Sequence, residues 1–324
     1  MAYHVAVIGS FRQYYDEVVR TIKILQNMGL NVTSPKGAKI TNSIEQFVIF
    51  ETDNPEYTPE EIQMITLEKI LSADAVYVCN PYGYVGKTTC YEIGFCYSRN
   101  KPLYFKELPI DLPMPVQNEQ IVTPEQFGKL ILKNEYGIYN NIDMCMPAKK
   151  SMETIFGENN NSTKVAVEDK KIVICGSMMF FKEMSLCRDI LRKNGLKAIV
   201  PKEENDIIEA YDEVAFREFK RKVSKAYLKK IREKDTSAVL IYNGTKKGQE
   251  NYIGANTLVE IAMAFAWNRK IYLFNDVYVP LADELLAWEC ICLNGNIEQL
   301  IFDMKKEVTN TEEFRQLTLF EQLF

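Results

Sequence analysis

The chain has 324 residues, enough for two domains of ordinary size with a hydrophobic core in each. Its hydrophobic fraction of 47% and charged fraction of 26% are typical of globular proteins, and its net charge of −5 gives no general attraction to nucleic acid. No apolar stretch reaches the roughly 18–20 residues that a membrane helix needs, and the N-terminus has no signal-peptide pattern. We therefore expect a cytoplasmic location without membrane contact.

The histidine and cysteine content narrows the chemistry further. The chain has a single histidine, His4, and eight cysteines scattered through the expected strands and helices, with no Cys-x-x-Cys pair. One histidine cannot serve a Ser-His or Cys-His mechanism in both halves of the chain, and it argues against a zinc site. The cysteines are interpreted as reduced thiols in the core. We therefore expect no metal and no cofactor.

In chain order, the first half alternates short apolar strands with helices. Strands are expected at residues 4–8, 30–33, 47–50, 75–79 and 102–105. Helices are expected at about residues 13–28, 58–72 and 90–98. Gly29 is a typical C-terminal stop for the first helix. Thr58 followed by Pro59 and two glutamates is a typical helix start, because proline and acidic residues are favoured in the first turn.

The second half repeats this plan. Strands are expected at residues 171–175, 198–200, 238–242 and 271–274. Helices are expected at about residues 181–194, 211–232 and 256–267. Strands that are apolar on both faces and alternate with helices predict a parallel sheet covered by helices on each side. Ligands bind such sheets beyond the carboxyl ends of the strands.

The two halves are related in register. Gly9 matches Gly176 at an offset of 167 residues, and Glu92 matches Glu260 at an offset of 168. An offset this constant predicts two homologous domains. We place domain one at residues 1–145, a polar linker at 146–168, domain two at 169–310 and a C-terminal tail at 311–324.

Glu92 is the strongest candidate for chemistry. It follows a Gly-rich strand-to-helix turn and lies early in a helix, whose dipole favours an ionised carboxylate. Gly86, Thr88 and Thr89 precede it and offer backbone N–H groups and hydroxyls for sugar or phosphate oxygens. An ionised carboxylate can displace a base from C1′ of a sugar and form a glycosyl-enzyme ester, which water or a second base resolves. The alternative is a glutamate that caps its own helix.

The second copy of this motif is less complete. Glu260 also follows a glycine by six residues, but the loop before it is longer, and Ala262 stands where the first copy has Gly94. A catalytic and a structural interpretation of Glu260 are both kept.

Two motifs of the first half resemble those of a known family. The turn Gly9-Ser-Phe-Arg12 and the segment Gly86-Lys-Thr-Thr-Cys-Tyr-Glu-Ile-Gly94 are similar to those of the nucleoside 2-deoxyribosyltransferase superfamily, which includes the 2′-deoxynucleoside 5′-phosphate N-hydrolases. The resemblance implies two tandem flavodoxin-like (Rossmannoid) α/β domains, each a parallel sheet with helices on both faces. It also implies that Glu92 is the nucleophile and that Ser10 and Arg12 contact a 5′-phosphate. The second half resembles the same superfamily.

The residues and the resemblance together define the candidate site. The candidate catalytic residues are Glu92, Glu68, Asp53 and Glu260. The candidate substrate-binding residues are Gly9, Ser10, Phe11, Arg12, Asn80, Tyr84, Gly86, Thr88, Thr89, Gly176, Ser177, Asn243, Gly254 and Asn256.

One departure from the family bears on activity. The related hydrolases carry an aspartate that assists protonation of the base or positioning of the sugar, and the corresponding position here is Thr66. A base that leaves without a proton donor leaves slowly. Either Glu68, Asp53 or Glu51 takes over this role in domain one, or the domain binds its ligand without cleaving it.

The expected function is therefore that of an enzyme that hydrolyses, or transfers the (deoxy)ribosyl group of, a nucleoside or nucleotide through a glutamate nucleophile. The alternative is a non-catalytic nucleotide-binding sensor or effector that uses the same pocket. Because the family builds sites across subunit interfaces, we expect either a homo-oligomer or a pseudo-dimer within the chain. The segment Gln316-Leu-Thr-Leu-Phe320 resembles peptides that dock on the bacterial sliding clamp, although its spacing equally suits a segment that packs on its own domain.

Overall fold

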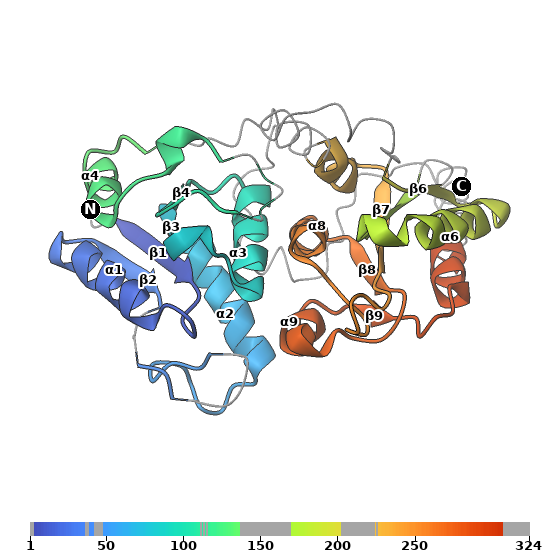
Figure 1. The fold of residues 1–324 in the computed structure, drawn as a ribbon, viewed down its shortest axis with the longest axis horizontal. Helices are drawn as coiled ribbons and strands as arrows, with labels where there is room; N and C mark the ends of the chain where they lie inside the picture. The colour runs from blue at the N-terminus through green and yellow to red at the C-terminus, as the bar shows by residue number, and fades with distance from the viewer. Residues whose placement is uncertain are drawn as a thin grey trace, which may run out of the picture.

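The computed structural model describes residues 3–35, 39–41, 48–110, 112, 114, 116–136, 170–201, 224 and 226–306. These residues form two parallel sheets flanked by helices, which confirms the predicted α/β fold with two flavodoxin-like units. We call the described residues up to 136 domain one and those from 170 onward domain two (Figure 1). The predicted linker at 146–168, the tail at 311–324 and most of the predicted helix at 211–232 lie outside the described residues.

Domain one is built on a four-stranded sheet with the order β2-β1-β3-β4. Its strands are β1 (His4–Gly9), β2 (Asn31–Ser34), β3 (Ala75–Cys79) and β4 (Leu103–Phe105), all paired in parallel. Its helices are α1 (Tyr15–Asn27), α2 (Pro59–Ser72), α3 (Lys87–Ser98) and α4 (Pro124–Leu132). Of the predicted strand at 47–50, the described residues contribute one isolated bridge, between Ile40 and Phe50.

The helices of domain one cover both faces of this sheet. On one face, α1 and α4 pack on the sheet through Val18, Leu25 and Phe127. On the other face lie α2 and α3. The predicted start of α2 is confirmed, because the Glu61 backbone N–H donates to Thr58 Oγ1 at 3.3 Å and the Thr58 N–H donates to Glu61 Oε2 at 2.8 Å.

Domain two repeats this arrangement with a five-stranded sheet in the order β6-β5-β7-β8-β9. Its strands are β5 (Lys171–Gly176), β6 (Lys197–Ile199), β7 (Thr236–Tyr242), β8 (Lys270–Leu273) and β9 (Ile291–Cys292), again all parallel. Its helices are α6 (Phe181–Lys193), α8 (Ala255–Ala266) and the short α9 (Ala282–Ala287). Residues 226–232 and 298–306 are also helical.

The two domains share one hydrophobic core. Figure 1 shows α3 of domain one facing α8 of domain two across the centre of the molecule, and these helices make extensive contact. They cross at Gly94, where an added Cβ would come within 3.0 Å of the Ala262 Cβ and 3.2 Å of the Val259 Cα. Nearby, the rings of Tyr91 and Trp288 stack with their centroids 3.3 Å apart. The domains therefore meet through corresponding helices of the repeat.

A second contact between the domains lies beside this core, where α2 packs against α9. The Lys87 ammonium donates to the Tyr278 hydroxyl at 2.9 Å and sits 4.4 Å from the centre of that ring. The contact between Lys87 and Tyr278 holds the N-terminus of α3 against domain two. It thereby brings part of domain two to the carboxyl edge of the first sheet.

Candidate functional site

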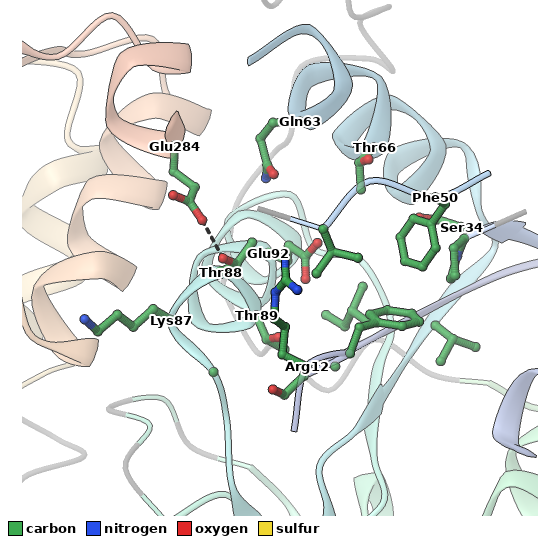
Figure 2. Close-up of a pocket in the computed structure, with 18 of the residues that line it drawn as sticks. Arg12, Ser34, Phe50, Gln63, Thr66, Lys87, Thr88, Thr89, Glu92 and Glu284 are labelled. Atoms are coloured by element: carbon green, nitrogen blue, oxygen red, sulfur yellow. Dashed lines mark hydrogen bonds between the residues drawn. The ribbon is translucent and has the colours of Figure 1, made fainter. Parts of the chain in front are cut away.

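A cavity of about 390 Å³ opens at the carboxyl edge of the sheet in domain one, where the sequence predicts ligand binding (Figure 2). Its walls come from the turn after β1, the segment before α2, the inner face of α2, the N-terminus of α3 and two residues of domain two. The polar residues among these walls include Ser10, Arg12, Asp53, Gln63, Thr66, Lys69, Thr88, Thr89, Glu92 and Glu284.

The N-terminus of α3 supplies the carboxylate that the sequence singles out. Gly86 is the N-cap of α3, so the free backbone N–H groups of the first turn follow it directly. Thr88 and Glu92 are four residues apart and therefore lie on the same side of the helix. Glu92 lines the cavity although only 9% of it is exposed. The predicted candidates Gly86, Thr88, Thr89 and Glu92 are thus brought together.

The protonation of Glu92 differs from the expectation based on the helix dipole. Burial, reinforced by the nearby carboxylate of Glu284, raises the pKa of Glu92 to about 8. The cost of moving a charged carboxylate out of water outweighs its attraction to the helix N-terminus. Burial therefore favours the protonated form of Glu92 in the free protein.

The turn after β1 forms the second wall. Gly9 allows close approach of the backbones, since an added Cβ would lie 2.6 Å from the Cys79 carbonyl oxygen. Ser10 lies next to the α3 turn, because a Cβ on Gly86 would be 3.7 Å from its Oγ. Phe11 packs edge-to-face on Phe50 with 4.8 Å between ring centroids, and both rings line the cavity. The predicted Gly9, Ser10, Phe11 and Arg12 all line this cavity.

The wall formed by α2 contains a polar residue that sequence analysis missed. Gln63 is only 2% exposed, lines the cavity, and has a buried Nε2 with no hydrogen-bond partner. Buried amides are ordinarily hydrogen-bonded, so an unpaired donor in a cavity wall is a site for a ligand acceptor. No motif in the sequence marks this residue, because its importance depends on the face of α2 that meets the cavity.

Of the three candidate acids of domain one, Asp53 lines the cavity, whereas Glu68 and Glu51 do not. Asp53 lines the cavity, but its carboxylate accepts from the Phe50 N–H at 2.8 Å and lies 3.9 Å from the Lys69 ammonium. The Asp53 carboxylate is therefore already engaged by partners within domain one. Glu68 is exposed on α2 and is not among the residues that line the cavity. Glu51 is exposed too and lies outside the lining.

Domain two contributes a carboxyl group that sequence analysis did not single out. Glu284 of α9 lines the cavity of domain one, together with Pro280, and only 6% of it is exposed. Figure 2 shows Glu284 extending toward Thr88, whose hydroxyl donates to Glu284 Oε1. Burial raises the pKa of Glu284, although the hydrogen bond from Thr88 opposes part of this shift. Two buried carboxyl groups, from different domains, thus line one cavity.

Other predicted residues near the first site have structural partners. The Asn80 amide donates to the Glu107 carbonyl at 2.8 Å and accepts from the Glu107 N–H at 3.1 Å. Asn80 therefore holds the loop after β4 in place. It does not line the cavity. Tyr84 does line it, whereas the exposed Tyr82 does not. Tyr91, next to Glu92 in the sequence, is fully buried and its ring stacks on Trp288.

The corresponding edge of domain two is occupied by the protein's own side chains. Ser177, after Gly176, accepts a hydrogen bond from the Lys246 ammonium at 3.0 Å, and this ammonium lies 4.9 Å from the Tyr252 ring centre. Asn243 pairs with backbone groups of Asp276 and Asn275, at 2.8 and 2.9 Å respectively. The edge therefore differs from that of domain one in its polar contacts.

Glu260 lies at the equivalent position on α8, whose N-cap is Gly254 and whose first turn carries the exposed Asn256. Burial raises the pKa of Glu260 to about 8, while a hydrogen bond with the Cys175 thiol lowers it in part. The Oε2 atom of Glu260 is buried without a hydrogen-bond partner. The predicted site residues of domain two do not line the cavity of domain one; these are Gly176, Ser177, Asn243, Gly254, Asn256 and Glu260.

Within the described part of the chain, no helix has both the length and the apolar character that a bilayer crossing requires. Comparison with protein-family models, with curated proteins and with solved structures finds no match to this chain. The chemistry assigned to the site therefore depends on its geometry. A buried carboxyl group near a helix N-terminus, aromatic rings and an unpaired amide donor line one cavity at the carboxyl edge of a parallel sheet.

Proposed function

We propose that the protein cleaves the N-glycosidic bond of a nucleoside or nucleotide, by hydrolysis or by transfer to a second base, with Glu92 as the nucleophile. The observation that carries this proposal is the position of Glu92, which lines the cavity behind the first turn of α3. The cavity volume of about 390 Å³ lies within the range of small-ligand pockets, roughly 300–1,000 Å³.

The surrounding residues suit the parts of such a substrate. Backbone N–H groups after Gly86, with Ser10 and the Arg12 guanidinium, offer donors to sugar or phosphate oxygens. The rings of Phe11 and Phe50 offer an apolar aromatic surface to a base. In the first step an ionised Glu92 oxygen attacks C1′, the C1′–N bond breaks, and its electron pair leaves with the base. In the second step water or another base displaces Glu92 from C1′.

A non-catalytic nucleotide-binding role is the second candidate function. It is favoured by the surroundings of Asp53, whose carboxylate is engaged by Lys69 and the Phe50 N–H, and by Thr66 in the place of the aspartate of the related hydrolases. In that case the same cavity would bind a nucleotide and hold it intact.

Base release and binding separate the two functions. Purified protein is incubated with nucleosides and 5′-monophosphates of each common base, and free base is measured by chromatography. We expect release from at least one substrate, and a loss of about a thousandfold or more in Glu92→Gln, because the nucleophile is removed. Glu250→Gln, an exposed change outside the cavity lining, is the matched control. Saturable binding without base release at high protein concentration would refute the enzyme and support the binding role.

A further inference from the structure

Glu284 belongs to domain two but lines the cavity of domain one. It lies on the short helix α9, which packs against α2 of domain one, and its side chain is almost fully buried. The Thr88 hydroxyl donates to Glu284 Oε1 (Figure 2). Since Oε1 is the acceptor in this contact, Oε2 is the atom that can carry a proton. Thr88 itself is one helical turn from Glu92 on the same face of α3.

The chemistry of the proposed reaction calls for such a group. A base leaves the sugar readily only if it receives a proton as the C1′–N bond breaks. Two neighbouring buried carboxyl groups resist double ionisation, so one of them holds a proton while the other is charged. The Glu284 carboxylate contributes to the raised pKa of Glu92, so the two side chains are close enough for the charge on one to affect the other. Once the pair has lost one proton, it can supply one carboxylate and one carboxylic acid to the same cavity.

The carboxyl groups of domain one are less suited to this role. Asp53 lies 3.9 Å from the Lys69 ammonium and accepts a hydrogen bond from the Phe50 N–H, and Glu68 is exposed away from the cavity lining. Glu284 is buried, accepts a hydrogen bond from a neutral hydroxyl and has no salt bridge among the described residues. Burial raises the pKa of Glu284, although the hydrogen bond from Thr88 and the charge of Lys87 oppose part of this shift, so the protonated form is favoured relative to an exposed glutamate.

We propose that Glu284, a residue of domain two, is the general acid that protonates the leaving base in the site of domain one, an inference that rests on the proposed N-glycosidase function. In the first step Glu284 Oε2 gives its proton to the base nitrogen as the C1′–N bond breaks and the Glu92–C1′ ester forms. In the second step the ionised Glu284 takes a proton from the incoming water or base, whose oxygen or nitrogen bonds to C1′ and frees Glu92. Both carboxyl groups return to their starting states.

The test compares two kinds of leaving group. An unmodified purine nucleoside needs a proton to leave, whereas N7-methylguanosine already carries a positive charge on its base and leaves as a neutral molecule. We expect Glu284→Gln, whose amide oxygen still accepts from Thr88, to lower release of the unmodified base by about a hundredfold or more. In the first turnover, before the second step limits the rate, release from N7-methylguanosine should stay close to that of the wild type. Glu92→Gln should abolish both, and Glu250→Gln neither.

A second variant keeps the test independent of small structural changes. Glu284→Ala leaves space beside Thr88, and added formate buffer should restore release of the unmodified base as a substitute acid. Equal losses on the two substrates in Glu284→Gln, no loss on either, or no rescue by formate would each overturn the role of Glu284. These results are distinct from failure of the proposed function, in which the wild type releases no base or Glu92→Gln releases it at the normal rate.

Discussion

Glu92 and Gln63 line the same cavity, but only the position of Glu92 can be predicted from the sequence. Glu92 belongs to a Gly-rich strand-to-helix turn that repeats in the chain, so its position at a sheet edge is predictable. Its raised pKa is not predictable, because it depends on burial and on Glu284 of the other domain. Gln63 stands within an ordinary helix, and only the packed structure shows that its amide donor is buried and unpaired. Asn80 is the opposite case: the sequence predicts a ligand contact for it, but in the structure its amide pairs with the backbone of a neighbouring loop.

The unpaired amide of Gln63 leads to a prediction with opposite effects on binding and stability. Gln63→Leu should weaken nucleoside binding by roughly 2–12-fold, the value of one neutral hydrogen bond. It should also leave the ligand-free protein as stable or more stable, by up to about 1 kcal/mol, because an unsatisfied buried donor is removed. The dissociation constant and the thermal midpoint check the two effects.

Gln26→Leu is the matched control for this change, because Gln26 is exposed on α1 and lies outside the cavity lining. It should leave both quantities near the wild-type values. Unchanged affinity in Gln63→Leu would contradict a ligand contact, and a lower thermal midpoint would show that the amide has a partner in the folded protein.

At the scale of elements, the predicted strands and helices of the sheets largely agree with the structure, because hydrophobic alternation is a local property. The short helix α9 was not predicted, since six residues carry too little periodicity. The predicted strand at 47–50 also differs: among the described residues Phe50 joins Ile40 in one isolated bridge, and its ring packs on Phe11 in the cavity wall. The pairing of α3 with α8 could not be derived from either helix alone, since both are apolar over most of their surface.

The crossing of α3 and α8 gives a stability prediction. Gly94→Val should destabilise the protein by about 1–3 kcal/mol, because the new side chain would overlap the Val259 backbone and the Ala262 methyl group. An isolated helix would instead gain stability when a glycine is replaced. The free energy of unfolding by urea measures the change. The same substitution should reduce base release, because separating the helices moves Glu284 away from Thr88.

A control for the helical effect is Lys129→Val, a change to the same side chain at an exposed position of α4. We expect it to cost about 0.5 kcal/mol or less and to leave base release unchanged. If Gly94→Val were as stable as the wild type, the close contact of the two helices would be contradicted.

At the scale of the whole molecule, two similar domains produce one composite cavity. The repeat predicts two equivalent sheet edges, and both Glu92 and Glu260 are buried carboxyl groups at those edges. The edges differ in what surrounds them. Lys246 contacts Ser177 in domain two, whereas the matching turn of domain one lines an open cavity that domain two completes with Glu284. The sequence shows that the two copies differ, because the loop before Glu260 is longer, but it does not show the contribution of Glu284, which depends on the way the domains pack.

The most direct test of the proposed chemistry is the mass of the peptide that contains Glu92 after a rapid acid quench. A nucleoside with a 2′-fluoro sugar is used as substrate, because the fluorine slows breakdown of the glycosyl ester. We predict that this peptide gains the mass of the sugar, that free base appears in equal amount, and that Glu92→Gln shows neither. Release of base at the wild-type rate in Glu92→Gln, with no sugar on the peptide in either protein, would contradict a glutamate nucleophile in this cavity.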